Sequence, residues 1–211
     1  MSNPLEVVGS VGNPSKMPCK TWGISAIHCK TGAKLAEIKG SICSSCYALR
    51  GNYLFSNVKS AHEIRLQKFN ESVENDDGKS WIAAMKQIIG KDKYFRFFDS
   101  GDLQSEKMLD IICQLAREMP KCKFWLPTKE LKLVSKYISR GNKIPKNLTI
   151  RLSAFKFEDA GPISLAKTLK VNVSGASKTD FTCPASRQDN NCGDCRKCWD
   201  KRVMSVVYKR H

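Results

Sequence analysis

The sequence predicts an α/β fold, a partial (open) βα barrel with a mostly parallel sheet of about five or six strands. Strand-like and helix-like segments alternate at roughly 20–30 residue intervals in the middle of the chain, as in βαβ units. The strands are too few for a closed eight-stranded barrel, and a doubly wound sheet is the alternative. A length of 211 residues accommodates one core, so we expect a single domain over 1–211.

We divide this domain into four consecutive parts. Residues 1–18, rich in Gly, Pro, Ser and Asn, are expected to form an irregular arm. Residues 19–56 make a first cysteine region, and residues 57–175 make the βα core. Residues 176–211 form a cysteine-rich C-terminal extension.

Hydrophobic periodicity locates the individual elements. Alternating or short apolar runs predict strands over residues 21–27, 94–98, 123–126, 148–152, 169–173 and 203–208. Apolar residues at helical spacing predict helices that begin near Asn57, Ser80, Ser105 and Leu131, with Ser80 and Ser105 as caps.

Charge and hydropathy limit the partners and the compartment. No apolar run approaches the ~20 residues of a membrane span, and the N-terminus has no signal-peptide pattern, so we expect a cytoplasmic protein without a membrane partner. A formal net charge of +16 favours nucleic acid or a phosphorylated substrate, although a Lys-rich soluble surface would also explain it. Residues 121–151 hold nine basic residues and one acid. The oligomeric state is not indicated.

Four cysteines near the C-terminus have the spacing of metal ligands. Cys183, Cys192, Cys195 and Cys198 lie within sixteen residues, and the last three form a continuous Cys-x-x-Cys-x-x-Cys run. In a reducing compartment such spacing favours metal binding over disulfides. The run resembles a ferredoxin cluster loop more than a zinc ribbon, so we predict a [4Fe–4S] cluster, with zinc as the alternative.

A second group lies in the first cysteine region. Cys29, Cys43 and Cys46 would give a site with three thiolates, whereas Cys19 would close it as a fourth ligand. Three thiolates on a cubane leave one iron open to a substrate or cofactor. We favour three, because Cys29 lies at the carboxyl end of the predicted first strand and Cys19 lies before it. The remaining cysteines, Cys113 and Cys122, are expected to be structural.

The turn after the predicted strand 94–98 is a candidate binding site. Carboxyl ends of parallel strands carry the ligands in such folds. We therefore take Asp99, Asp102 and Lys129 as candidate catalytic residues, and Ser100 and Gly101 as candidate cofactor-binding residues. The alternative is a plain helix-entry turn, with Gly for the bend and Asp and Ser as caps.

Several motifs together resemble the phage "gene product 88" family, which has no known function. They are Lys16-Met-Pro18, Cys43-x-x-Cys46-Tyr47-Ala48-Leu-Arg-Gly51-x-Tyr53, Phe95-Arg-Phe-x-Asp99-Ser-Gly-Asp102, Trp125-Leu-Pro-Thr-Lys129 and Cys183-Pro…Cys192-Gly-x-Cys195-Arg-x-Cys198-Trp199. The resemblance runs from about residue 14 to the end and implies a protein of the infected host's cytoplasm.

A looser resemblance connects the chain to radical-SAM enzymes, which also have partial βα barrels. It implies a site-differentiated cluster on Cys29, Cys43 and Cys46, and an auxiliary cluster on the C-terminal cysteines. It also implies S-adenosylmethionine at Asp99 to Asp102. This chain lacks their Cys-x-x-x-Cys-x-x-Cys signature, since thirteen residues separate Cys29 from Cys43.

Two hypotheses follow. The first is an iron–sulfur cluster-binding protein of the phage type, a radical-SAM-like or other reductive enzyme with a cluster at the mouth of a partial βα barrel. The second is a nucleic-acid-binding protein with structural zinc or iron–sulfur sites and a basic face on residues 121–151.

Overall fold

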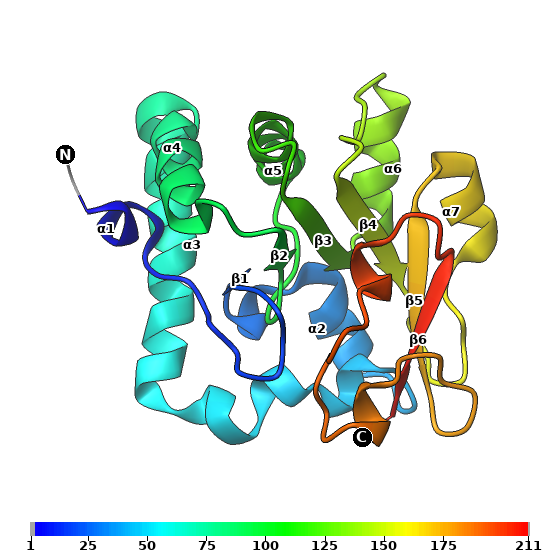
Figure 1. The fold of residues 1–211 in the computed structure, drawn as a ribbon. Helices are drawn as coiled ribbons and strands as arrows, with labels where there is room; N and C mark the ends of the chain where they lie inside the picture. The colour runs from blue at the N-terminus through cyan, green and yellow to red at the C-terminus, as the bar shows by residue number, and fades with distance from the viewer. Residues whose placement is uncertain (1–2, 211) are drawn as a thin grey trace.

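The sheet has six parallel strands in sequential order. The computed structural model describes residues 3–210. Neighbours pair in the order β1-β2-β3-β4-β5-β6, and β1 does not pair with β6, so the sheet stays open (Figure 1). The strands are β1 Thr21–Trp22, β2 Tyr94–Phe97, β3 Lys123–Thr128, β4 Leu148–Ser153, β5 Asn172–Ser177 and β6 Ser205–Lys209. A doubly wound sheet would reverse its strand order, so this order confirms the open βα barrel.

Residues 3–210 contain seven α-helices and several short 3-10 turns; α1 precedes β1, and the other six helices connect the strands. The helices are α1 Pro4–Val8, α2 Lys30–Ala36, α3 Ser56–Asp76, α4 Lys79–Ile89, α5 Glu106–Glu118, α6 Leu131–Ser139 and α7 Ile163–Leu169. The predicted cap at Ser105 is confirmed, since its hydroxyl accepts from Met108 N at 3.0 Å. Ser80 is not a cap, because α4 begins after Gly78 and the Ser80 hydroxyl meets that of Ser72 at 2.8 Å.

Some predicted boundaries are wrong. The first strand ends at Trp22, because the chain then turns under the carboxyl end of β2, where Ile24 N donates to the carbonyl of Ser100. The strand placed at 169–173 begins later, because Leu169 ends the unpredicted helix α7 and Lys170 takes a left-handed φ of +54°. Helices α1 and α2 lie in stretches expected to be irregular.

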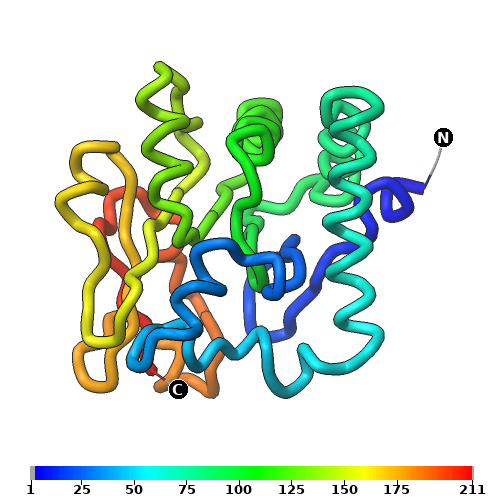
Figure 2. Tube along the Cα trace, turned by 180° about the vertical axis from the view of Figure 1, so that it is seen from behind, coloured from blue at the N-terminus to red at the C-terminus, as the bar shows by residue number. Residues whose placement is uncertain are grey.

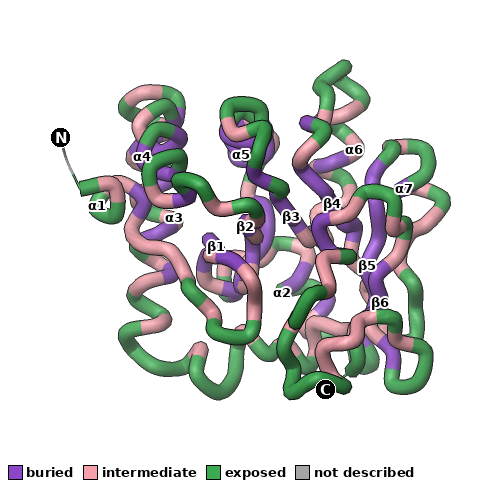
Figure 3. The backbone as a smooth tube through the Cα atoms, in the orientation of Figure 1, coloured by how far each residue is buried: buried purple, intermediate pink, exposed green. Residues whose placement is uncertain are grey.

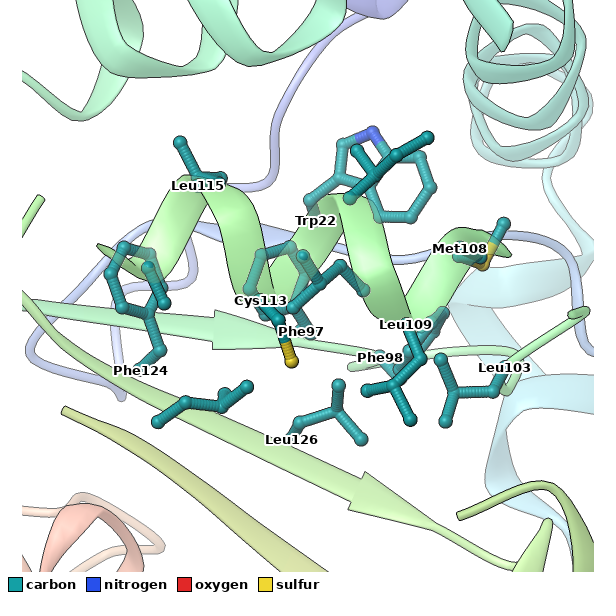
Figure 4. Close-up of a cluster of buried hydrophobic side chains, with 14 of the residues drawn as sticks. Trp22, Phe97, Phe98, Leu103, Met108, Leu109, Cys113, Leu115, Phe124 and Leu126 are labelled. Carbon is teal, nitrogen blue, oxygen red and sulfur yellow. The ribbon is translucent and has the colours of Figure 1, made fainter. Parts of the chain in front are cut away.

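The larger core lies between the helices and one face of the sheet. Side chains alternate between the two faces of a strand. Phe95 and Phe97 of β2 therefore point the same way and pack with Phe124 of β3 and with helices α4 and α5. Figure 4 shows Leu109 and Cys113 of α5 on the side of the helix that faces the strands. Cys113 is fully buried there, as expected of a structural cysteine.

The opposite face of the sheet is covered by the segment that joins β5 to β6. This segment, residues 178–204, contains the C-terminal cysteines and passes in front of the strands in Figure 1. Its Cys198 and Trp199 pack with Trp125 of β3, Val206 of β6 and Cys19 of the N-terminal arm. We call this the inner face.

The carboxyl ends of the strands lie at the lower edge in Figure 1. Residues 26–56 run along this edge, and the view from behind shows the same arrangement (Figure 2). No helix among residues 3–210 is both long and apolar enough to cross a membrane.

Candidate functional site at the carboxyl edge of the sheet

Three of the predicted ligand cysteines meet at this edge, which we call the mouth. Cys29 precedes α2, Cys43 begins a 3-10 turn, and Cys46 ends that turn. A Cβ placed on Gly32 would lie 3.6 Å from the sulfurs of both Cys29 and Cys43, so both thiols lie beside the same point of α2. Burial raises the pKa of the Cys29 thiol, and Asp102, Cys46 and Cys43 raise it further. The three thiols therefore lie within electrostatic reach of one another.

Replacement of Gly32 by alanine is expected to destabilise the protein. In most helix interiors Gly→Ala gains about 1 kcal/mol. Here the new Cβ would lie 2.9 Å from Cys29 Cβ, a contact that forces α2 away from the thiols. We expect Gly32→Ala to lower the free energy of unfolding by roughly 1–3 kcal/mol in urea titrations.

The neighbouring exposed residue supplies the control. Ala33→Gly makes the reverse substitution at the next position of α2. It should lower the free energy of unfolding by only about 1 kcal/mol, because glycine has the lower helix propensity. A Gly32→Ala variant more stable than the natural chain would show that α2 does not press on the cysteines.

Asp102 lies behind the thiols and joins β2 to β3. Its Oδ1 accepts from Leu103 N at 2.8 Å and from Thr128 Oγ1 at 2.5 Å, and its Oδ2 accepts from Lys129 N at 2.8 Å. Burial raises the pKa of Asp102 to about 6, against the lowering effect of these donors. Because both of its oxygens accept hydrogen bonds, Asp102 holds the end of β3 beside the turn that follows β2, and so fixes this part of the mouth.

Lys129 and Glu130 complete the wall on the β3 side. The positive charge of Lys129 lowers the pKa of Cys43, although burial raises it overall. Glu130 accepts from Thr31 N and from Thr31 Oγ1, both at 2.8 Å, and so holds the first turn of α2 over the end of β3. Gly32 was not a candidate from sequence, because its closeness to the Cys43 thiol depends on how α2 packs against the following turn.

The turn after β2 contributes buried polar atoms. Asp99 Oδ1 and Ser100 Oγ are buried without a hydrogen-bond partner among the described residues. The backbone carbonyl of Asp99 accepts a hydrogen bond of 2.5 Å from the hydroxyl of Tyr47, which is the residue after Cys46. Gly101 has a φ of +77°, and a Cβ there would lie 2.7 Å from the Ile24 carbonyl oxygen, so the turn requires glycine. The predicted residues therefore lie at the mouth, in a turn that is also a tight helix entry.

The C-terminal cysteines form a second group on the inner face, which we call the knot. Burial raises the pKa of the Cys183 and Cys192 thiols, Cys195 raises both further, and Cys183 also raises that of Cys192. The Cys198 thiol lies 3.3 Å from the Tyr208 hydroxyl.

Cys19 belongs with the knot. It packs against Cys198 on the inner face, and Cys192 N donates to the carbonyl of nearby Lys16 at 3.0 Å. Cys192 also contributes to the raised pKa of Cys19, while none of the mouth cysteines does. The mouth therefore has three of these thiols, as preferred from sequence.

Arg151 holds the knot against the sheet. This side chain of β4 is fully buried. Its acceptors within 3.1 Å are all backbone carbonyls, those of Val173, Lys197, Cys198, Asp200 and Val203. No carboxylate is among the hydrogen-bond partners of this buried cation in the described chain.

Arg96 lies between the two cysteine groups. Its guanidinium stands 4.4 Å above the Trp125 ring on the inner face. Its charge lowers the pKa of Cys19 and Cys192 in the knot, and also that of Tyr47 at the mouth. One cation thus acts on the knot and on Tyr47, the residue that follows Cys46.

The basic run 121–151 is not one surface. Arg151 is buried at the knot, and Lys136 and Arg140 both pair with Glu106, at 3.0 and 2.7 Å. Lys129 faces the mouth. The expected basic face therefore loses several of its members to other contacts.

Among residues 3–210, no three His, Cys, Asp or Glu side chains are arranged to hold a single metal ion. Zinc bonds of ~2.3 Å would need the sulfurs in near contact.

The comparisons with known proteins give one match. The family model described as Gene product 88 matches residues 6–201. No curated protein and no solved structure matches.

Proposed function

Because this chain belongs to the phage protein family Gene product 88, whose members have no assigned activity, we propose its function from the chemistry of the mouth. The protein is an iron–sulfur protein with a [4Fe–4S] cluster on Cys29, Cys43 and Cys46, open at one iron to a substrate or cofactor. A cluster with one open iron suits a reductive or radical-SAM-like enzyme.

The observation that carries the proposal is the separation of the cysteines into two groups. Three thiols share the carboxyl edge of the sheet, where open βα folds bind ligands, and Cys19 lies elsewhere. A fourth thiolate would close the site, whereas three leave a position for chemistry.

The polar turn after β2 supports a small-molecule ligand at the open iron. Asp99 Oδ1 and Ser100 Oγ lack partners in the described chain and would gain them from an amino or hydroxyl group. S-adenosylmethionine is the candidate that the radical-SAM likeness supplies. Lys129 offers a positive charge to an acidic group of the substrate, in keeping with the net charge of +16.

A second cluster on the knot is supported by charge. Arg151 is a buried cation whose hydrogen-bond acceptors are backbone carbonyls, with Asp200 as the carboxylate that acts on it, and the charge of Arg96 acts on Cys192. Burying a charge without a counter-charge is unfavourable. An anionic metal–thiolate centre on Cys183, Cys192, Cys195 and Cys198 would supply the counter-charge.

Anaerobic purification tests the proposal. We expect a brown protein with broad visible absorption and equal amounts of iron and acid-labile sulfide. Replacing Cys29, Cys43 and Cys46 together by Ser should remove roughly half of the iron, since one of two like clusters is lost. Cys113→Ala, at a structural cysteine in the core between α5 and the sheet, should leave the iron content unchanged.

Two results would overturn the proposal. A colourless protein that carries stoichiometric zinc would replace both clusters by structural sites. Full iron retention in the triple Ser variant would place all the iron on the knot and leave the mouth without a cluster.

A further inference from the structure

The mouth is bordered by an exposed apolar stretch, residues 47–59, which we call the rim. Four large apolar side chains of the rim are exposed: Tyr47, Leu49, Leu54 and Phe55. Phe55 is 60% exposed and Tyr47 is 56% exposed, more than is usual for aromatic residues. Figure 3 shows much of this stretch in green, along the lower edge of the molecule. Exposed apolar side chains grouped in this way mark an interaction site.

The charge of the rim is positive. Arg50 and Lys59 are exposed, and the sequence of residues 47–59 contains no acid. Neither cation takes part in an ion pair among residues 3–210, and Arg50 makes one long contact, 3.4 Å to the Ser44 carbonyl. The rim therefore combines ring faces with free positive charge.

The aromatic rings are held by contacts beneath them. The Tyr47 hydroxyl donates to the Asp99 carbonyl, and the Tyr47 ring meets Tyr53 edge-on at 5.7 Å. Tyr53 in turn stacks on His62 of α3, also at 5.7 Å. A ring fixed in this way loses little freedom when a flat group stacks on it.

We propose that the rim binds single-stranded nucleic acid, with bases stacked on Tyr47 and Phe55 and phosphates beside Arg50 and Lys59. Aromatic faces next to a basic track are the means by which proteins bind single strands without reading their sequence. A base pair in a duplex does not expose its ring face to such a platform, so the rim prefers single strands.

The rim is continuous with the mouth, since Tyr47 directly follows Cys46. A strand on the rim places a nucleotide next to the three thiols, which makes a base or sugar of that strand the substrate. This last step rests on the proposed function, whereas strand binding does not.

Fluorescence anisotropy with labelled oligothymidylate, oligouridylate and a duplex of the same length tests the proposal. We expect Phe55→Ala to weaken single-strand binding by roughly 10- to 100-fold, the effect of losing one stacked base. Arg50→Gln should reduce the slope of log affinity against log salt by about 0.7. The two single strands show whether DNA or RNA is bound more tightly, and the duplex should bind more weakly than either.

Matched controls come from the opposite edge of the molecule. Met204→Ala removes an exposed apolar side chain and Lys143→Gln an exposed cation, and both should bind like the natural chain. Unchanged thermal unfolding of the rim variants shows that they remain folded. Iron content, measured on the same samples, separates loss of strand binding from loss of the cluster.

Three results would overturn the proposal. They are the absence of saturable strand binding, tighter binding to the duplex, and binding that Lys143→Gln weakens while Phe55→Ala does not. A rim variant that changes only the oligomeric state would make the rim a protein interface instead.

Discussion

Arg151→Met is expected to lower the free energy of unfolding by about 3–5 kcal/mol, the range for breaking a buried charged network. Methionine fills a similar volume but donates no hydrogen bond. Five carbonyls, from the knot segment and β5, would lose their donor away from water. Each buried polar group left unpaired is unfavourable by roughly 1–3 kcal/mol, and relaxation of the segment recovers part of that loss.

Urea unfolding under anaerobic conditions measures this loss. Arg151→Lys keeps the charge but has three donors in place of five. Its free energy of unfolding should therefore fall between those of the natural chain and Arg151→Met. It also supplies a value if the Met variant does not fold. Arg117→Met, at an exposed arginine with one bond to the Lys143 carbonyl, should change stability by less than about 0.5 kcal/mol. A similarly small effect at Arg151 would mean that the knot does not depend on it.

The second large effect is expected at Asp102. Asp102→Ala removes the acceptor of Leu103 N, Thr128 Oγ1 and Lys129 N in one step. We expect a loss of about 3 kcal/mol or more, since several buried donors become unpaired together. Because these donors fix the ends of β2 and β3, the mouth should also lose its iron while the knot retains its own.

Asp102→Asn separates the charge from the hydrogen bonds. The amide oxygen can replace Oδ1, but the amide NH₂ would face the Lys129 N–H, donor against donor. We expect about 1–3 kcal/mol of destabilisation and partial iron loss. Asp194→Asn, at an exposed aspartate within the knot segment, is the control and should leave both measurements unchanged. Full iron content in Asp102→Ala would show that the mouth does not need this carboxylate.

The fold class was predictable because its strongest elements are local. β2, β3 and β4 are short apolar runs, each separated from the next by one amphipathic helix. This pattern can be recognised from the local sequence, because it does not depend on contacts between distant residues. Helix α2 was not predictable, because its seven residues include Gly32 and its first turn is held by Glu130, 99 residues away. Strand β1 was overextended for a similar reason, since the chain leaves the sheet to bond with Ser100.

The candidate site was predictable in composition and less so in arrangement. Spacing picks out candidate ligand cysteines, but it does not show on which side of the sheet the N-terminal arm runs, and this decides where Cys19 lies. Arg151 belongs to a basic run in sequence, and only its burial reveals its contacts with the knot. The Asp102 carboxylate was chosen as a reacting group, whereas three donors occupy it.

The sequential strand order has a consequence for synthesis at the ribosome. Each strand from β2 to β5 pairs with the strand made just before it, so most of the sheet can form as the chain emerges. Arg151 cannot form its hydrogen bonds to the knot until Lys197 has been synthesised, because that carbonyl is 46 residues further along the chain. Until then its guanidinium faces water, and the edge of β5 lacks its partner β6. We therefore expect closure of the inner face, which needs residues 178–204 and β6, to be a late step of folding.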